Sequence, residues 1–150
     1  MAKLPYPGGI RDKSRVNLDA INYVNPYQTI YFQFDVTITS SRLIAIIPKD
    51  ALIYNALCQV QEVFTTRNTK LRIGTIDNSS SIGVFDLMNE GVRFIETFGL
   101  NWGKILMEDT PVYASIAIPS GESVNTRGRG YGIINYLNMP LIPSFQKVVQ

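Results

Sequence analysis

The sequence contains no histidine and only one cysteine among its 150 residues. Without histidine there is no Ser–His or Cys–His pair for nucleophilic catalysis, and no imidazole ligand for a metal ion. A single cysteine cannot form an intrachain disulfide, and its presence is compatible with synthesis in a reducing compartment. The commonest catalytic and metal-binding constellations therefore lack their residues, and we expect neither an enzyme nor a cofactor.

Charge and long apolar runs are also scarce. Charged residues make up 17% of the chain, and 14 Lys and Arg against 12 Asp and Glu give a formal net charge of +2. So small an excess is no footprint of nucleic-acid binding. The apolar runs are shorter than the roughly 20 residues of a membrane-spanning helix, and the N-terminus lacks the apolar stretch of a signal peptide. We expect a protein made in the cytoplasm, with neither nucleic acid nor a membrane as its partner.

What the chain does contain is a succession of short alternating stretches. In TIYFQFDVTIT (29–39), Ile30, Phe32 and Phe34 begin an apolar series that continues at every second residue, which predicts a strand with one face on the core. Further strands are predicted at 42–47, 51–64, 70–75, 92–98, 111–118 and 130–137. Residues 45–64 read as two neighbouring strands joined by a turn that begins at Pro48. Within the part between the two ends of the chain, residues 81–91 suggest a helical turn or two, ended by Gly91.

Strands at this density, divided by Pro, Gly, Ser and Asn, favour an antiparallel sandwich or barrel over βαβ units. We divide the chain into an extended N-terminal arm (1–28), a β-sandwich domain (29–138) and a short C-terminal tail (139–150). Prolines and glycines interrupt both ends, yet both are too apolar for idle tails. The apolar side chains that we expect to anchor the ends on a neighbour are Leu4, Tyr6, Ile10, Tyr23, Tyr27, Leu141, Ile142 and Phe145.

The order of these segments resembles the small β-sandwich decoration (cement) and head-fibre proteins of tailed bacteriophages. The resemblance covers about 43–137, and the arm and residues 85–104 depart from the compact pattern. Its residues are Ile47-Pro48 with Ala51-Leu52-Ile53, Val60 to Phe64, Leu71-Ile73-Gly74, Pro111-Val112-Tyr113 and Ile133 to Tyr136. It implies a jelly-roll-like sandwich, a homotrimer, and a place on the outer capsid surface, where the protein bridges subunits of the major capsid protein. The chain would be made in the cytoplasm of a bacterial host.

Individual motifs have ordinary interpretations beside the functional ones. Cys58 lies on the predicted inward face of a strand, where a thiol is a small hydrophobic group. The loop 75–81 has oxygen ligands for Ca²⁺ but reads as a plain surface loop, and RGRG (127–130) reads as a hairpin turn rather than a phosphate site. Glu108-Asp109 is expected in a solvated turn. Trp102 is either a half-buried loop residue or a platform for a sugar or an interface.

Three functions therefore stay open. The first is a virion structural protein that decorates or cements a capsid shell without enzymatic activity. The second is a tail, neck or fibre-attachment component built on the same sandwich. The third is a carbohydrate-binding sandwich that uses Trp102 and exposed tyrosines. An enzyme has the least support, because no acid–base pair can be named.

Overall fold

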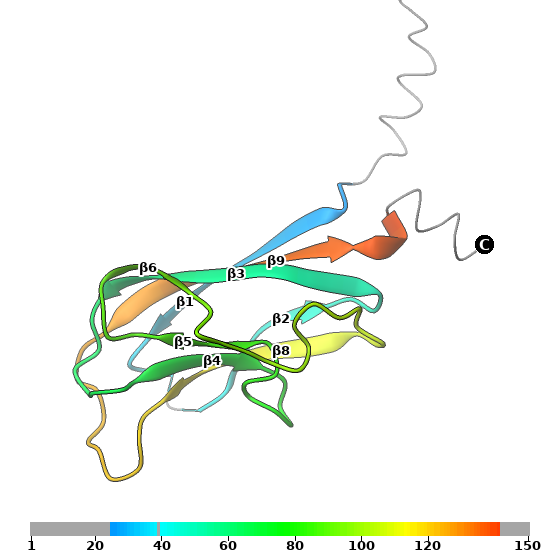
Figure 1. The fold of residues 1–150 in the computed structure, drawn as a ribbon. Coiled ribbons are helices and arrows are strands. Elements are labelled where there is room, and N and C mark those ends of the chain that lie inside the picture. Colours follow the sequence, from blue (N-terminus) through cyan, green and yellow to red (C-terminus); the bar gives the residue numbers. More distant parts are fainter. Residues whose placement is uncertain (1–24, 39, 142–150) are drawn as a thin grey trace, which may run out of the picture.

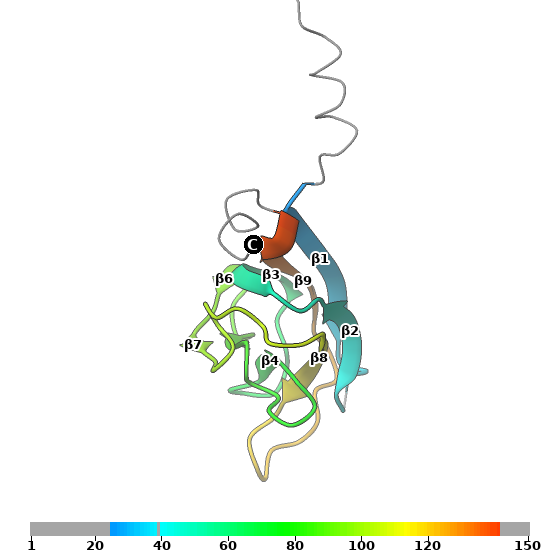
Figure 2. The same cartoon turned by 90° about the vertical axis from the view of Figure 1, so that its right-hand side faces the viewer.

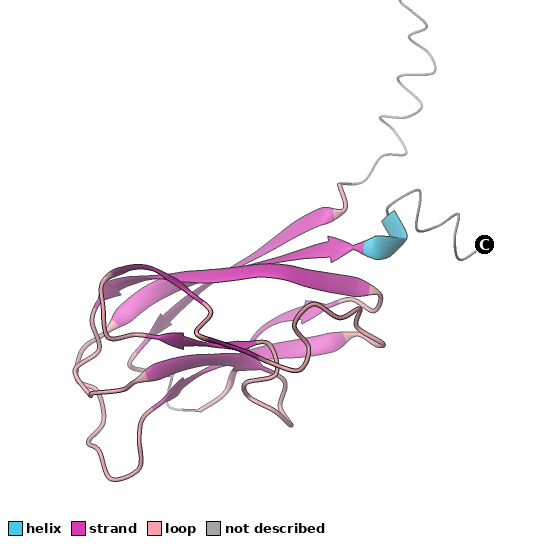
Figure 3. Cartoon of the chain, in the orientation of Figure 1, coloured by secondary structure: helices cyan, strands magenta, loops and turns pink. Residues whose placement is uncertain are grey.

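The computed structural model describes residues 25–38 and 40–141, which form two antiparallel sheets packed face to face (Figure 1). One sheet has four strands in the order β1 (Tyr27–Asp35), β9 (Arg129–Asn138), β3 (Ala51–Glu62) and β6 (Gly91–Phe94). The other has five in the order β2 (Arg42–Ile47), β8 (Thr110–Ala117), β4 (Lys70–Gly74), β5 (Gly83–Asp86) and β7 (Thr97–Phe98). Within the described ranges, the helical content is one 3₁₀ turn, η1 (Met139–Leu141) (Figure 3). The expected all-β antiparallel sandwich is confirmed.

The pairing of the strands explains how the chain is wound. β1 pairs with β9, β2 with β8, β3 with β6, and β4 with β5, all antiparallel. These pairs are what a long hairpin gives when it rolls up, as in a jelly roll. Successive strands from β1 to β4 alternate between the two sheets, and β4 and β5 then form a hairpin within the five-stranded one. At one side of the sandwich the edge strands β1 and β2 lie side by side (Figure 2).

The expected pair of neighbouring strands in 45–64 does not share a sheet. β2 lies in the five-stranded sheet and β3 in the four-stranded one, so the turn between them carries the chain across the sandwich. Asp50 has a φ of 67° and its backbone N–H donates to the Leu106 carbonyl (2.8 Å), while Lys49 N–H donates to the Asp109 carboxylate (2.8 Å). Both strands bury one face, and an apolar face alone does not specify which sheet a strand joins.

The expected helical turn in 81–91 is wrong. Residues 83–86 form β5, and Ile82, Phe85 and Leu87 are buried. The predicted strand at 92–98 is split into β6 and β7, which belong to different sheets. Gly91, at a φ of 98°, begins β6 instead of ending a helix. Pairing with β4 and β7 overrides the weak local preference for a helix.

The core lies between the inner faces of the two sheets. From β3 and the residues after it come Cys58, Val60 and Phe64, and β4 contributes Leu71 and Ile73, as the alternation predicts. Val112 and Ala114 of β8, which lies beside β4 in the same sheet, are also fully buried, again as predicted. β1 ends at Asp35, four residues earlier than expected, because Thr37 N–H turns back to donate to the Asp35 carboxylate (2.8 Å).

Two glycines of β9 make room for aromatic rings in this core. A Cβ atom on Gly132 would lie 2.0 Å from Cζ of Phe32, and one on Gly130 would lie 2.6 Å from Cζ of Phe34. Phe34 is 1% exposed and also stacks on Phe64, with ring centroids 6.1 Å apart. On the core side of β9, rings from β1 therefore occupy the space that larger side chains at Gly130 and Gly132 would fill. The large side chains of β9, such as Tyr131 and Ile133, lie on its opposite side.

Candidate interaction surface

Residues that lie opposite one another on neighbouring strands form rows across the four-stranded sheet. On the outward side of this sheet, no side chain is charged between the row that contains Tyr27 and the row that contains Gln33. We call this surface the outer face. Its side chains are Tyr27, Thr29, Tyr31 and Gln33 of β1; Tyr131, Ile133, Asn135 and Leu137 of β9; Leu52, Tyr54, Leu57 and Gln59 of β3; and Val92 and Phe94 of β6. They project outward because their chain neighbours at alternate positions face the core.

The centre of the outer face is an apolar row that crosses all four strands. Tyr31 lies opposite Ile133, Ile133 opposite Leu57, and Leu57 opposite Phe94. Tyr31 is 75% exposed and Phe94 is 69% exposed, although both are large and apolar. The next row is Gln33, Tyr131, Gln59 and Val92. Exposed apolar side chains that are contiguous, rich in tyrosine and free of charge are typical of the core of a protein interface.

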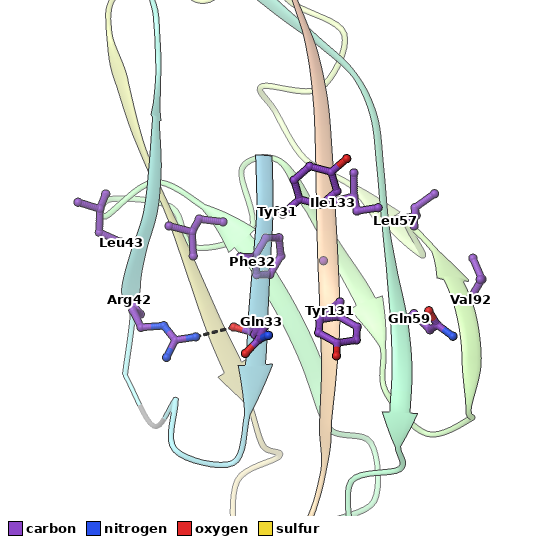
Figure 4. A pocket seen from close by; sticks show the side chains of 12 residues that line it. Tyr31, Phe32, Gln33, Arg42, Leu43, Leu57, Gln59, Val92, Tyr131 and Ile133 are labelled. Carbon is purple, nitrogen blue, oxygen red and sulfur yellow. Dashed lines mark hydrogen bonds between the residues drawn. The ribbon is translucent and has the colours of Figure 1, made fainter. Parts of the chain in front are cut away.

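A groove of about 810 Å³ runs over these two rows and extends to β2 (Figure 4). Leu43 and Ile44 of β2 line its far side, where the open edge of the sandwich brings β2 next to β1. The Arg42 guanidinium donates to the backbone carbonyl of Gln33 and links the two sheets there. Leu43 is 50% exposed and adds apolar surface. The groove is shallow, open and mostly apolar, which suits an extended ligand better than an enclosed small molecule.

At the opposite end of the outer face the polar groups are already paired. The Thr29 hydroxyl donates to the side-chain oxygen of Asn135 (2.9 Å). Beyond this row, the rings of Tyr27 and Tyr54 meet edge to face with centroids 6.2 Å apart. The whole outer face therefore offers aromatic and aliphatic surface with few unpaired polar groups.

The anchors expected from the sequence fall mostly outside the described residues. Tyr27 is described, 59% exposed, and belongs to β1 instead of preceding it. Leu141 is described only by its backbone, in η1. Leu4, Tyr6, Ile10, Tyr23, Ile142 and Phe145 lie outside the described ranges. The outer face itself was not predicted from the sequence. The available signal was that the outward positions of β1 and β9 carry Tyr, Gln and Asn where a solvated strand usually carries Lys or Glu.

Cys58 behaves as the small hydrophobic group expected. Its side chain is fully buried, and burial raises the pKa of the thiol to about 12. The thiol is therefore neutral at ordinary pH, and a neutral buried thiol is a poor nucleophile.

Trp102 lies in a turn and packs partly buried against the core, as the half-buried interpretation predicted. Its ring contacts that of Phe98 in a tilted arrangement, with ring centroids 5.1 Å apart. One side of the indole is thus already occupied, which leaves less of it for a sugar.

The polar groups of the 75–81 loop and of RGRG (127–130) are paired with other groups of the protein. In the 75–81 loop the Asn78 carbonyl accepts from Thr75 N–H (2.9 Å), and the Asn78 side-chain oxygen accepts from Ser80 N–H (3.1 Å). Arg127 and Arg129 each lie 3.8 Å from a carboxylate oxygen of Glu62. Across residues 25–38 and 40–141 no group of three or more His, Cys, Asp or Glu could hold a metal ion. No helix in that part of the chain is long and apolar enough to span a membrane.

Two chains from phage capsid structures share this fold. A chain of the cyanophage Pam1 capsid asymmetric unit matches with a TM-score of 0.52 and 12% identity, over 91% of this chain and 93% of that one. A chain of the acid-stable capsid of Helicobacter pylori bacteriophage KHP30 matches with a TM-score of 0.55 and 10% identity, over 77% of this chain and 90% of that one. No protein-family model and no curated protein matches the sequence. At these identities the likeness establishes the fold, and the sandwiches it matches are those of phage capsids.

Proposed function

We propose that this chain is a non-enzymatic structural protein of a tailed-phage particle, and that it decorates or cements the outer capsid shell by bridging neighbouring subunits of the major capsid protein. The observation that carries the proposal is the extent of the fold likeness, which takes in 93% and 90% of two capsid-structure chains. A match that takes in most of each chain means that the shared unit is the complete sandwich.

The chemistry of the outer face supports this role. A protein that joins shell subunits needs a rigid core and surfaces that bury on their neighbours, and it needs no nucleophile. Burial of apolar surface stabilises by roughly 25 cal/mol per Å², and closed symmetry repeats each contact at every copy. Tyr31, Phe94 and Val92 offer such surface, and the anchors assigned to the two ends of the chain would add to it. A homotrimer is the form that the resemblance to decoration proteins implies.

Two other roles use the same sandwich. A tail, neck or fibre-attachment protein would differ in copy number and place. A carbohydrate-binding module is the other candidate, favoured by the tyrosine and glutamine side chains of the groove, since aromatic faces and amides suit sugars. Absence of binding on a glycan array, with a well-folded protein, would remove that candidate.

The test of the proposal is the copy number in purified particles, measured by quantitative mass spectrometry against the major capsid protein. Decoration predicts a copy number equal to that of the capsid protein or a simple fraction of it. A handful of copies per particle would move the protein to the neck or tail. Absence from particles would end the virion role and leave the carbohydrate-binding candidate.

A further inference from the structure

The groove over the outer face has the dimensions of an extended peptide. The groove crosses four strands about 4.8 Å apart, which gives it a length of about 15–20 Å, and it covers the rows of Tyr31 and Gln33, which lie about 7 Å apart along the strands. So narrow a strip is far smaller than the roughly 800 Å² that each partner contributes to a standard interface between globular proteins. A segment of six or seven extended residues has the matching length.

The lining of the groove favours one kind of segment. Tyr31 and Tyr131 present rings, and Leu57 and Val92 add apolar contacts. Arg42, the one charged residue of the lining, already donates to the Gln33 carbonyl. Grooves lined by aromatic side chains bind proline-containing segments in the extended polyproline conformation, because that conformation is preformed and costs little entropy to hold. The expected ligand is thus short, uncharged and rich in proline.

The chain itself contains such a segment outside the described residues. Residues 4–10 read LPYPGGI: they carry Pro5 and Pro7, they contain no charge, and they are bounded by Lys3 and Arg11. The segment has seven residues, about the length of the groove. Residues 11–24 join it to the described part of the chain and can extend to about 46 Å.

The start of β1 favours the groove of another molecule over that of the same chain. Asn138 N–H donates to the Pro26 carbonyl (2.7 Å), which continues the β1–β9 ladder beyond Tyr27. The side chain of Asn25 then accepts from Tyr27 N–H (2.9 Å) and fixes this direction. Asn25 and Pro26 therefore lie past the end of the sheet that is farther from Gln33. The 4–10 segment is attached at that end of β1, whereas the groove of the same chain lies at the other end.

We propose that the 4–10 segment of one copy binds in the tyrosine-lined groove of a second copy, with Pro5 and Pro7 against Tyr31 and Tyr131. Each copy then gives one segment and receives one, and such a head-to-tail exchange closes into a ring when the rotation between copies permits. The inference goes beyond the proposed function, because it concerns contact between copies of this chain and needs no shell.

The test uses purified full-length protein with one engineered thiol per molecule. A Tyr6→Cys variant is mixed with a size-tagged Gln59→Cys variant and treated with a short thiol crosslinker. Gln59 is exposed in the groove, so this substitution leaves the core intact. Cys58 is buried, with a thiol pKa of about 12, and does not compete for the reagent. The control replaces the groove partner with Ser120→Cys, which is exposed in a turn outside the groove.

We expect at least tenfold more mixed dimer from the groove pair than from the control pair, and at least a tenfold fall when Pro5→Ala and Pro7→Ala are added to the Tyr6→Cys chain. Equal yields from the two pairs would overturn the proposal and leave the groove to a shell protein or a glycan. A crosslink found only inside single chains of a Tyr6→Cys/Gln59→Cys double variant would place the segment on its own sheet, which also overturns it. Neither failure changes the copy number in particles, so the two proposals are tested separately.

Discussion

The two sheets of the sandwich present very different surfaces to their surroundings. On the five-stranded sheet, the Lys70 ammonium lies 2.8 Å from a Glu96 carboxylate oxygen and 3.8 Å from one of Asp86, and Arg72 is exposed on the same strand. On the four-stranded sheet, the outer face has no charged group in the rows from Tyr27 to Gln33. Charges of both signs keep a surface in water, and their absence beside exposed tyrosines indicates a surface that becomes covered.

If the outer face is a surface for partners, its side chains should contribute little to folding. Shortening one side chain on each side of β1 tests this, and it has the largest expected effect. Phe34→Ala should lower the free energy of unfolding by about 3–5 kcal/mol, because it empties a fully buried site beside Gly130 and Phe64. Tyr31→Ala, three residues away on the outer face, should cost less than about 1 kcal/mol. Urea unfolding of both variants measures the difference. Similar losses would mean that the outer face is part of the fold's own packing.

A charge introduced on the outer face should weaken association with other molecules, whereas the same charge on the five-stranded sheet should not. Leu57→Glu introduces a carboxylate at the centre of the uncharged row, where covering it without a partner costs several kcal/mol. We expect at least a tenfold weaker association between copies or with particles, measured by sedimentation. The matched variant Val84→Glu, opposite Arg72 on the five-stranded sheet, should change association less than twofold. Equal effects would erase the distinction between the surfaces.

The ion pairs of the five-stranded sheet should be weak. Glu96→Gln removes the shorter contact of Lys70, whose side chain and partner are both partly in solvent. Because water and salt screen such pairs, we expect a loss of at most about 1 kcal/mol, shrinking further at 1 M salt. Thermal unfolding at low and high salt measures it. A loss that salt does not reduce would show that the pair does more than keep this surface solvated.

The smallest expected effect lies at the border of the outer face, where Asp35 ends β1. The hydroxyl and backbone N–H of Thr37 donate to the Asp35 carboxylate and lower its pKa below the usual 3.8. A lowered pKa means that the folded state binds this proton less tightly than the unfolded state. The contribution to stability is therefore present above the unfolded pKa and lost as the pH falls through the folded one.

Asp35→Asn should accordingly cost slightly more stability at pH 7 than at about pH 2. Paired urea titrations of the wild type and the variant at the two pH values measure the difference. A cost that does not change with pH would contradict the assigned role of the carboxylate.

The sequence allowed the strands and the inner face to be predicted, because alternation reports directly which residues face the core. Leu71 and Ile73, or Val112 and Ala114, lie where the pattern places them. Pairing was not predictable in the same way. The turn at Pro48 was expected to join neighbours and instead crosses between sheets, since an apolar face can be buried in either sheet.

The candidate site was less accessible to sequence reasoning than the fold. The outer face depends on strands far apart in the sequence, and Tyr31, Ile133 and Phe94 become neighbours only through register. The glycines of β9 show the same limit. Gly132 looks like a weak point in a strand, and its reason is the ring of Phe32, about a hundred residues away in the chain. Anchors were expected in the two ends of the chain, and those beyond the described ranges stay predictions.

The central claim is that the outer face is covered in the assembled protein. Hydroxyl-radical footprinting of intact particles, read out by mass spectrometry, tests it most directly through Tyr31 and Tyr131, with the 83% exposed Met107 as internal reference. We predict that the oxidation rates of both tyrosines, relative to Met107, fall at least tenfold below those of a dissociated Leu57→Glu variant. Tyrosines that react in particles as fast as in that variant would contradict the claim.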